Sequence, residues 1–192
     1  MGAESFDSRS LIRDHDMDIS RALETQTYKM IRLRLCGIKA TMGLGSCLAG
    51  LLLPGDVILL SGDLGAGKTT LVKAIASGLG IDERMVTSPS FAIIHEYRGG
   101  RLPFCHADLY RLGDRGDIAE TCLVEYMDGK WVVVVEWGEY LDDELKTEAL
   151  KITLEWLDEE VRDTMIEDGG QWGARLHGLE SCIKNTQKKD KD

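Results

Sequence analysis

The stretch "SGDLGAGKTT", residues 61–70, is the feature that most restricts what this chain can fold into. It matches the pattern G-x-x-x-x-G-K-[ST], which marks a loop whose backbone N–H groups cradle a chain of phosphates. Such a loop follows a buried strand and leads into a helix. The apolar run "VILLSG" before it and residues 68 to about 79 after it suit those two elements. The stretch therefore predicts an α/β unit of strand, loop and helix.

The roles of the loop residues follow from the chemistry of phosphate binding. Gly62 and Gly67 are needed because a Cβ would collide with phosphates that the loop wraps closely. Lys68 can reach the β and γ phosphates, and Thr69 can give its hydroxyl oxygen to Mg²⁺. The residues expected to hold the nucleotide are Asp63, Leu64, Gly65, Ala66, Gly67, Lys68, Thr69 and Thr70.

Two carboxylates at expected strand ends complete the predicted site. Glu136 follows four consecutive valines, where a buried carboxylate needs either solvent or a cation, so we expect it to be catalytic and to bind Mg²⁺. Asp108 in "HADLY" is the second catalytic candidate, with its role open between holding metal, positioning water and capping the strand. His95 and His106 have no metal-ligand spacing with other residues, and we interpret them as structural.

The rest of the pattern predicts a central, mostly parallel sheet with an antiparallel hairpin and flanking helices. "FAIIHEY" and "LPFCHADLY" flank "RGGR" and read as the hairpin, and "WVVVVEW" reads as a strand buried on both faces. "MIRLRLCGI" and "LKITLEW" read as further strands, with "VRDTMIE" a candidate to pair with the second. Residues 41–53 and "GQWGARLHGLESCIKN" read as helices.

Composition limits the classes of function. The 192 residues suit one domain, and a net charge of −10 argues against a surface that wraps nucleic acid directly. The five cysteines are scattered without a CxxC pair, which favours small buried side chains in a reducing compartment and disfavours zinc. No apolar run is long enough to span a membrane, so we expect a cytoplasmic protein with no membrane partner.

Domain boundaries follow from the same composition. We expect residues 1–27 to be an extension, either disordered or an artefact of cloning or of the start site. Residues 28–180 would form the P-loop domain, and residues 181–192 a charged tail.

Several kinds of P-loop protein remain to be separated. The chain contains neither the N/T-K-x-D nor the D-x-x-G pattern of a GTPase, and it is too short for a typical motor. A small-molecule kinase would need a mobile lid that bears arginines, which Arg98, Arg101, Arg111 and Arg115 could supply. From the residues alone, this kinase stays the alternative to an ATPase.

Four segments of the chain occur in a characteristic order and spacing: "PGDVILLSGDLGAGKTTLVKAIASGLG", "VTSPSFAIIHEYRGG", "HADLYRL" and "VVVVEWGEYL". Together they resemble the TsaE family, formerly YjeE, of P-loop ATPases in bacterial tRNA threonylcarbamoyladenosine biosynthesis, and the resemblance runs from about residue 28 to 179. It implies a P-loop NTPase fold, ATP and Mg²⁺ as ligands, and TsaD and TsaB as partners, through which tRNA would mainly be reached. The chain would thus support formation of the modification on the adenosine 3′ of the anticodon.

The resemblance also implies roles for particular residues. Asp108 and Glu136 would belong to the ATPase site, and Trp137 directly follows Glu136. A switch segment near the nucleotide would comprise Thr87, Ser88, Pro89, Ser90 and Phe91. Ser90 replaces the family's usual Thr and keeps a hydroxyl, whereas Gly138 replaces the usual Pro and is expected to loosen the turn. The short polar switch suits a loop that orders when a partner packs on it. We therefore expect an ATPase that is weak alone and stimulated by partners.

Overall fold

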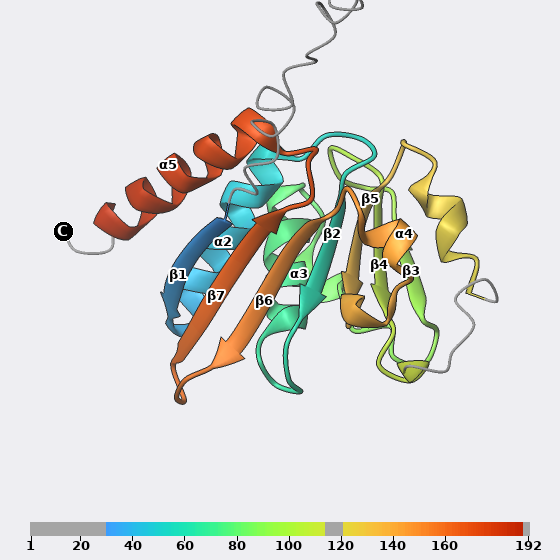
Figure 1. Cartoon of the computed structure of the whole chain (residues 1–192), viewed down its shortest axis with the longest axis horizontal. Helices are drawn as coiled ribbons and strands as arrows, with labels where there is room; N and C mark the ends of the chain where they lie inside the picture. The colour runs from blue at the N-terminus through green and yellow to red at the C-terminus, as the bar shows by residue number, and fades with distance from the viewer. Residues whose placement is uncertain (1–29, 114–120, 190–192) are drawn as a thin grey trace, which may run out of the picture.

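The computed structural model describes residues 30–113 and 121–189, which build one seven-stranded sheet flanked by helices (Figure 1). The extension expected over residues 1–27 lies outside the described residues. The strands are β1 (Met30–Cys36), β2 (Val57–Ser61), β3 (Ile94–Tyr97), β4 (Phe104–Asp108), β5 (Val132–Glu136), β6 (Leu150–Trp156) and β7 (Val161–Asp168). The helices are α2 (Gly37–Leu51), α3 (Lys68–Gly78), α4 (Asp143–Lys146) and α5 (Gly173–Lys189), with short 3-10 turns η1 (Glu83–Met85), η4 (Leu123–Met127) and η5 (Gly138–Tyr140).

The strands follow the order β1-β7-β6-β2-β5-β4-β3, with a parallel centre and antiparallel edges. β6, β2, β5 and β4 run parallel, so their carboxyl ends meet at one edge of the sheet. The predicted hairpin is the antiparallel pair β3–β4, and the last two strands, β6 and β7, also pair antiparallel, as the alternating segments suggested. The predicted fold class is confirmed.

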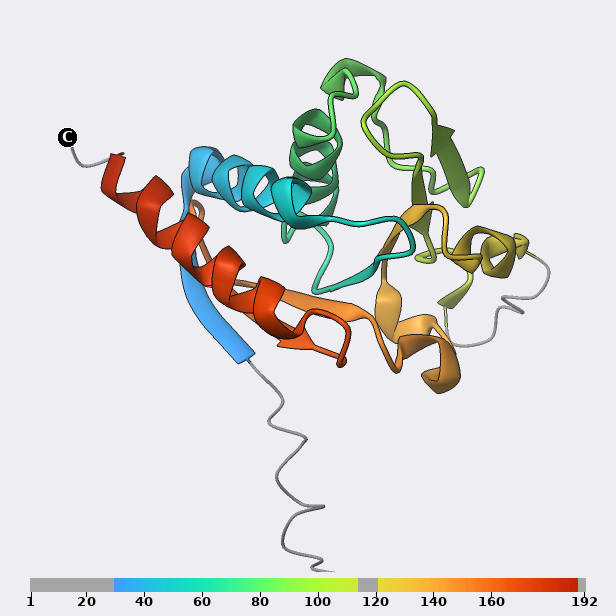
Figure 2. The same ribbon diagram turned by 90° about the horizontal axis from the view of Figure 1, so that it is seen from above.

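Both faces of the central strands are covered. Helices α2, α3 and α5 pack on one face, and the η4, η5 and α4 segments lie against the other (Figure 2). β5 shows the effect on a single strand. Val132 and Val134 face the first layer while Val133 and Val135 face the second, and all four are fully buried. This arrangement explains the continuous apolar run, because a strand buried on both faces has no polar side.

Helix α2 begins at Gly37, four residues before the predicted start at Thr41. Gly37 adopts a φ of +71°, and its N–H donates to the carbonyl oxygen of Glu160 at 2.6 Å, so the chain turns from β1 directly into the helix. Gly45, inside the helix, has a packing role. A Cβ on Gly45 would come within 2.3 Å of the Ala74 Cβ on α3, so α2 and α3 can approach closely only with glycine there.

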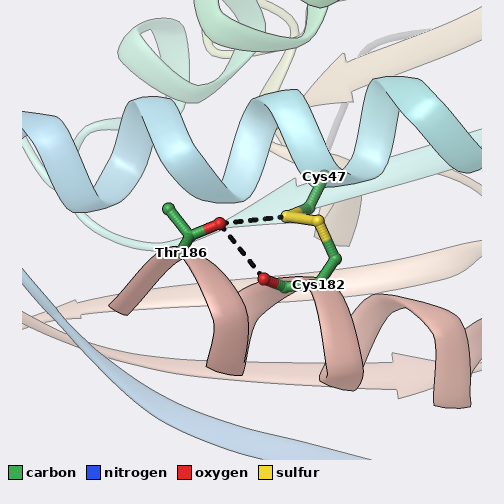
Figure 3. Close-up of a disulfide and its surroundings, with 3 residues drawn as sticks. All are labelled: Cys47, Cys182 and Thr186. Atoms are coloured by element: carbon green, nitrogen blue, oxygen red, sulfur yellow. Dashed lines mark hydrogen bonds between the residues drawn. A yellow bond between two sulfur atoms is a disulfide. The ribbon is translucent and has the colours of Figure 1, made fainter. Parts of the chain in front are cut away.

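The cysteines correct one expectation. Cys47 on α2 and Cys182 on α5 form a disulfide across 135 positions, with Thr186 beside it (Figure 3). Of the three free cysteines, Cys105 is buried, but Cys36 and Cys122 are exposed. The prediction of small buried side chains therefore holds for Cys47 and Cys105 and is wrong for the exposed Cys36 and Cys122 and the half-buried Cys182. The pairing depends on the packing of two helices far apart in sequence, which the number and spacing of cysteines do not show.

Helix α5 runs past residue 181, where the charged tail was expected to begin, and ends at Lys189. The Asp168 carboxylate accepts hydrogen bonds from the backbone N–H groups of Gly170, Trp172 and Gly173 at the start of the helix. None of the helices in the described part of the chain combines the length and apolar character that crossing a membrane would require.

Candidate nucleotide site

The phosphate loop connects the end of β2 to the start of α3, at the edge where the parallel strands end. Gly62 has a φ of +133°, and a Cβ there would come within 2.2 Å of the Leu154 carbonyl oxygen on β6. Gly67 has a φ of +108° and immediately precedes the first residue of α3. Both glycines are thus required by the backbone itself. Residues 63–67 form the loop, and residues 68–70 form the first turn of the helix.

Lys68 is held inside this loop. Its ammonium group donates to the carbonyl oxygens of Gly62 at 2.5 Å and Asp63 at 2.9 Å, and it lies 3.8 Å from the centre of the Trp137 ring. Burial lowers the pKa of Lys68, while the negative charges of Glu136 and other nearby carboxylates oppose that shift. The two carbonyl contacts and the Trp137 ring therefore hold the Lys68 side chain at a fixed place in the loop.

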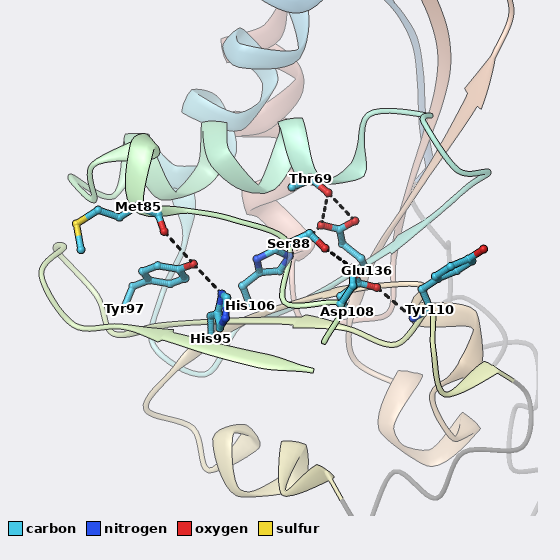
Figure 4. A network of polar contacts seen from close by, with 10 residues as sticks. Thr69, Met85, Ser88, His95, Tyr97, His106, Asp108, Tyr110 and Glu136 are labelled. Carbon is cyan, nitrogen blue, oxygen red and sulfur yellow. Dashed lines mark hydrogen bonds and ion pairs between the residues drawn. The ribbon is translucent and has the colours of Figure 1, made fainter. Parts of the chain in front are cut away.

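Glu136 is linked to the loop by Thr69. The Thr69 hydroxyl donates to both carboxylate oxygens of Glu136, at 2.7 Å to Oε1 and 2.9 Å to Oε2 (Figure 4). On its other side, Glu136 Oε1 accepts a hydrogen bond of 2.9 Å from Nε2 of His106, which is fully buried. The carboxylate is itself almost completely buried, so these donors replace the water that an exposed carboxylate would have.

The Thr69 and Glu136 oxygens are of the kind that Mg²⁺ prefers. Within residues 30–113 and 121–189, no three or more His, Cys, Asp or Glu side chains form a group that could hold a metal ion. Mg²⁺ commonly takes one or two protein ligands and completes its shell with phosphate oxygens and water. The residues present therefore fit an ion that arrives with a nucleotide better than a permanent metal centre.

Asp108 lies directly opposite Glu136 in the register of β4 and β5. Its Oδ2 accepts hydrogen bonds from the hydroxyls of Ser88 at 2.5 Å and Ser90 at 2.7 Å, and its Oδ1 accepts the Tyr110 N–H at 3.1 Å (Figure 4). The expected apposition of the two carboxylates is present. The contacts also connect Asp108 to the segment expected to act as a switch.

The five predicted switch residues differ in their surroundings. Ser88 and Ser90 contact Asp108, whereas Pro89 is buried and its carbonyl oxygen accepts the Ile93 N–H at 2.6 Å. Thr87 is exposed. Phe91 is 86% exposed, with the guanidinium of Arg111 3.9 Å from the centre of its ring. The segment thus has an inner side on the carboxylate and an outer side open to solvent.

Trp137 has a left-handed backbone, with φ of +60°, and its ring lies beside the phosphate loop. The ring stacks on Tyr140 at 6.0 Å between centres and packs against Tyr110 at 5.0 Å. Gly138 does not behave as a loose link. It is buried, and a Cβ there would lie 2.7 Å from the Leu59 Cβ.

His106 is the contact that sequence reasoning missed. The lack of metal-ligand spacing around His106 predicts a structural role only, yet its Nε2 forms a hydrogen bond with Glu136 Oε1. The available signal was its position two residues before Asp108 on the same strand, which places both side chains on one face.

Three comparisons with known proteins bear on this site. The family model for "Threonylcarbamoyl adenosine biosynthesis protein TsaE" matches residues 36–164. The tRNA threonylcarbamoyladenosine biosynthesis protein TsaE of Bacillus subtilis is 40% identical over 135 residues, which cover 70% of this chain and 84% of that protein. The protein of the same name from Streptomyces coelicolor is 42% identical over 126 residues, or 65% and 82% of the two chains.

The fold agrees with these sequence matches. The crystal structure of YdiB from Bacillus subtilis superposes with a TM-score of 0.64 at 34% identity, covering 86% of this chain and 99% of that one. The family model spans the phosphate loop, the switch segment and both carboxylates. The chain therefore belongs to the TsaE family.

Proposed function

We propose that this chain is a Mg²⁺-dependent ATPase that supports TsaB and TsaD in forming the threonylcarbamoyl modification of the adenosine 3′ of the tRNA anticodon. The observation that carries the proposal is the contact between Thr69 and Glu136. It joins the first turn after the phosphate loop to the carboxylate at the end of the neighbouring strand. Binding of a nucleoside triphosphate with its metal ion needs a hydroxyl and a carboxylate close together, as Thr69 and Glu136 are.

Binding of the triphosphate would use the loop and Lys68. Residues 63–70 would hold the phosphates with backbone N–H groups and the amino end of α3. The Lys68 ammonium would exchange its contacts with the Gly62 and Asp63 carbonyls for phosphate oxygens, which form stronger charge-assisted bonds. Burial next to Trp137 keeps the lysine beside the loop while this exchange takes place.

The metal would be held by Thr69 and Glu136. When bound, Mg²⁺ neutralises the charge that develops on the phosphates. The residues of the chain supply the positions: His106 holds one oxygen of Glu136, and Thr69 directs its own oxygen to the same place. Asp108 is opposite and would act on the metal or on the attacking water, in contact with the hydroxyls of Ser88 and Ser90.

The role in tRNA modification rests on the family. The relatives are named for tRNA threonylcarbamoyladenosine biosynthesis, the resemblance adds TsaB and TsaD as partners, and the composition of the chain suits a cytoplasmic location. The net charge of −10 suits a chain that reaches tRNA mainly through these partners. Residues 28–180 would form the ATPase domain in this scheme.

The alternative, a small-molecule kinase, is less well supported. Arg101 donates to the carbonyl oxygens of Ala49 and Leu52 at the end of α2, and Arg98 bonds to Glu96. These two arginines are engaged elsewhere, Arg111 lies over the Phe91 ring of the switch segment, and Arg115 lies outside the described residues.

The test uses ATP labelled at the γ phosphate. The parent and Glu136→Gln are incubated with Mg²⁺, with and without the TsaB and TsaD proteins of the same organism, and all labelled products are separated. The ATPase releases labelled inorganic phosphate in a reaction that needs Glu136. A labelled small molecule in place of phosphate would establish the kinase instead.

A further inference from the structure

A tryptophan lies on the other side of the phosphate loop from the carboxylates. β6 runs beside β2 and in the same direction, with Thr153 paired to Ser61, the last residue of β2 (Figure 1). β6 then continues to Trp156. A Cβ built on Gly65 would lie 4.0 Å from Cζ3 of the Trp156 ring. The indole is therefore a direct neighbour of the loop.

Arg162 on β7 fixes this arrangement. Its Nε donates to the carbonyl oxygen of Ala66 in the loop at 3.0 Å, and another guanidinium nitrogen donates to the Asp158 carbonyl oxygen at 2.9 Å. The guanidinium carbon is 5.1 Å from the centre of the Trp156 ring, within the range of a cation–π contact. One side chain thus joins the phosphate loop, the turn between β6 and β7, and the indole.

The two tryptophans beside the phosphate loop differ in how much of the indole ring is free to contact a ligand. Trp137 packs against Tyr110 and Tyr140 and lies 3.8 Å from the Lys68 ammonium, so its ring is already in use. Trp156 is 54% exposed although Arg162 holds it in place. A flat aromatic surface that is positioned and still open to solvent can receive a planar ligand.

The order of the strands gives the direction of a bound nucleotide. Asp108 and Glu136 end β4 and β5, which lie on one side of β2, while β6 lies on its other side. The γ phosphate has to be near the carboxylates for hydrolysis. The nucleoside is at the opposite end of the triphosphate, so it extends away from them, toward Trp156.

We propose that Trp156 is the stacking platform for the base of a purine nucleoside triphosphate. This inference rests on the proposed function and adds to it the residue that binds the base. Stacking on an aromatic side chain is tolerant of base identity, because every base has a π face. The platform therefore supports ATP and GTP similarly, and the smaller pyrimidine rings less.

The experiment compares ligands with and without a base. Binding of Mg²⁺-ATP, Mg²⁺-GTP and inorganic tripolyphosphate is measured by calorimetry for the parent, Trp156→Ala and Trp156→Phe. Loss of one stacked base weakens binding by about 5- to 150-fold. We expect that loss for both nucleotides in Trp156→Ala, an unchanged affinity for tripolyphosphate, and recovery of most of the affinity in Trp156→Phe. The neighbouring Leu157→Ala, which removes another half-exposed apolar side chain, should bind like the parent.

Two results would overturn the role of Trp156 in stacking and leave the proposed ATPase function in place. One is a Trp156→Ala variant that binds ATP as the parent does, while Lys68→Ala still abolishes binding. The other is an equal loss of ATP and tripolyphosphate in Trp156→Ala, which would make the indole a support for the loop. If the parent bound neither ATP nor tripolyphosphate, the proposed function would fail and the platform with it.

Discussion

Thr69 and Glu136, which are 67 positions apart, are joined by one hydroxyl that donates to both carboxylate oxygens. Thr69 belongs to the first turn of α3, and Glu136 is the last residue of β5. The contact brings together the phosphate loop and the carboxylate edge of the sheet. It also means that each residue can be tested through its effect on the other.

Replacing either partner should separate metal binding from nucleotide binding. Thr69→Ala removes a hydroxyl oxygen from the proposed metal site, so the concentration of Mg²⁺ needed for half-maximal hydrolysis should rise. Glu136→Gln removes the negative charge and should lower kcat by about a hundredfold with a smaller change in ATP affinity. Steady-state kinetics at varied Mg²⁺ measures both effects. Thr147→Ala, at an exposed threonine outside the phosphate loop, is the matched control, and a parental Mg²⁺ response in Thr69→Ala would remove Thr69 from the metal site.

Lys68→Ala should abolish productive ATP binding and leave the fold in place. The variant loses the ammonium group that faces the loop carbonyls, and with it the charge-assisted bonds to phosphate, so the affinity for ATP should fall about a hundredfold or more. Calorimetry with Mg²⁺-ATP measures the affinity, and circular dichroism checks the fold. Lys73→Ala, on the same helix but outside the loop, should bind normally. An unchanged affinity in Lys68→Ala would refute the phosphate site.

The two serines of the switch should act through Asp108. Ser88 and Ser90 both donate to its Oδ2, so removing one hydroxyl leaves the other in place, and only the double variant leaves this oxygen without either donor. We expect Ser88→Ala and Ser90→Ala to reduce kcat modestly and the double variant to approach Asp108→Asn, with ATP affinity retained in all four. Ser77→Ala at the exposed end of α3 serves as the control. Additive small effects with no approach to Asp108→Asn would show that the serines do not position this carboxylate.

The disulfide should stabilise the packing of α5 on α2. The bond closes a loop of 135 residues, and removing a crosslink of this kind typically lowers the free energy of unfolding by about 2–5 kcal/mol. Chemical denaturation of the parent, the reduced parent and Cys182→Ser measures the difference. The reduced parent and Cys182→Ser should be destabilised alike, and Cys36→Ser, at an exposed free cysteine, should match the parent. Equal stability with and without reductant would contradict this role.

The sequence predicted the features that depend on local constraints. The phosphate loop could be found because glycines at fixed spacing are demanded by the backbone, and β5 could be found because four valines in a row suit a strand buried on both faces. The apposed ends of β4 and β5 followed from the same reasoning. Each of these signals lies within a few consecutive residues of the chain.

The features that were missed depend on tertiary packing. His106 reaches Glu136 across 30 positions, and Arg162 reaches the loop carbonyl of Ala66 across 96. Cys47 and Cys182 meet only because α5 returns to α2 at the end of the chain. Each of these contacts joins two single residues that are far apart in the sequence. No periodic pattern of residues is needed to form such a contact, so none marks it in the sequence.

Partner proteins should stimulate a weak intrinsic ATPase through Phe91. This side chain is 86% exposed on the outer side of the switch, whose inner side contacts Asp108, so a protein that packs on the ring can fix the serines and the carboxylate together. Misalignment of reacting groups alone can cost about a hundredfold in rate, and we expect TsaB with TsaD to raise kcat by a factor of that order. Phe91→Ala should lose most of the stimulation, whereas Met85→Ala, at another exposed apolar residue outside the switch, should keep it. The test measures the rate of ATP hydrolysis by the parent and each variant, alone and with TsaB and TsaD. Rapid turnover by the isolated parent would count against a switch, and full stimulation of Phe91→Ala would show that the partners act elsewhere on the surface.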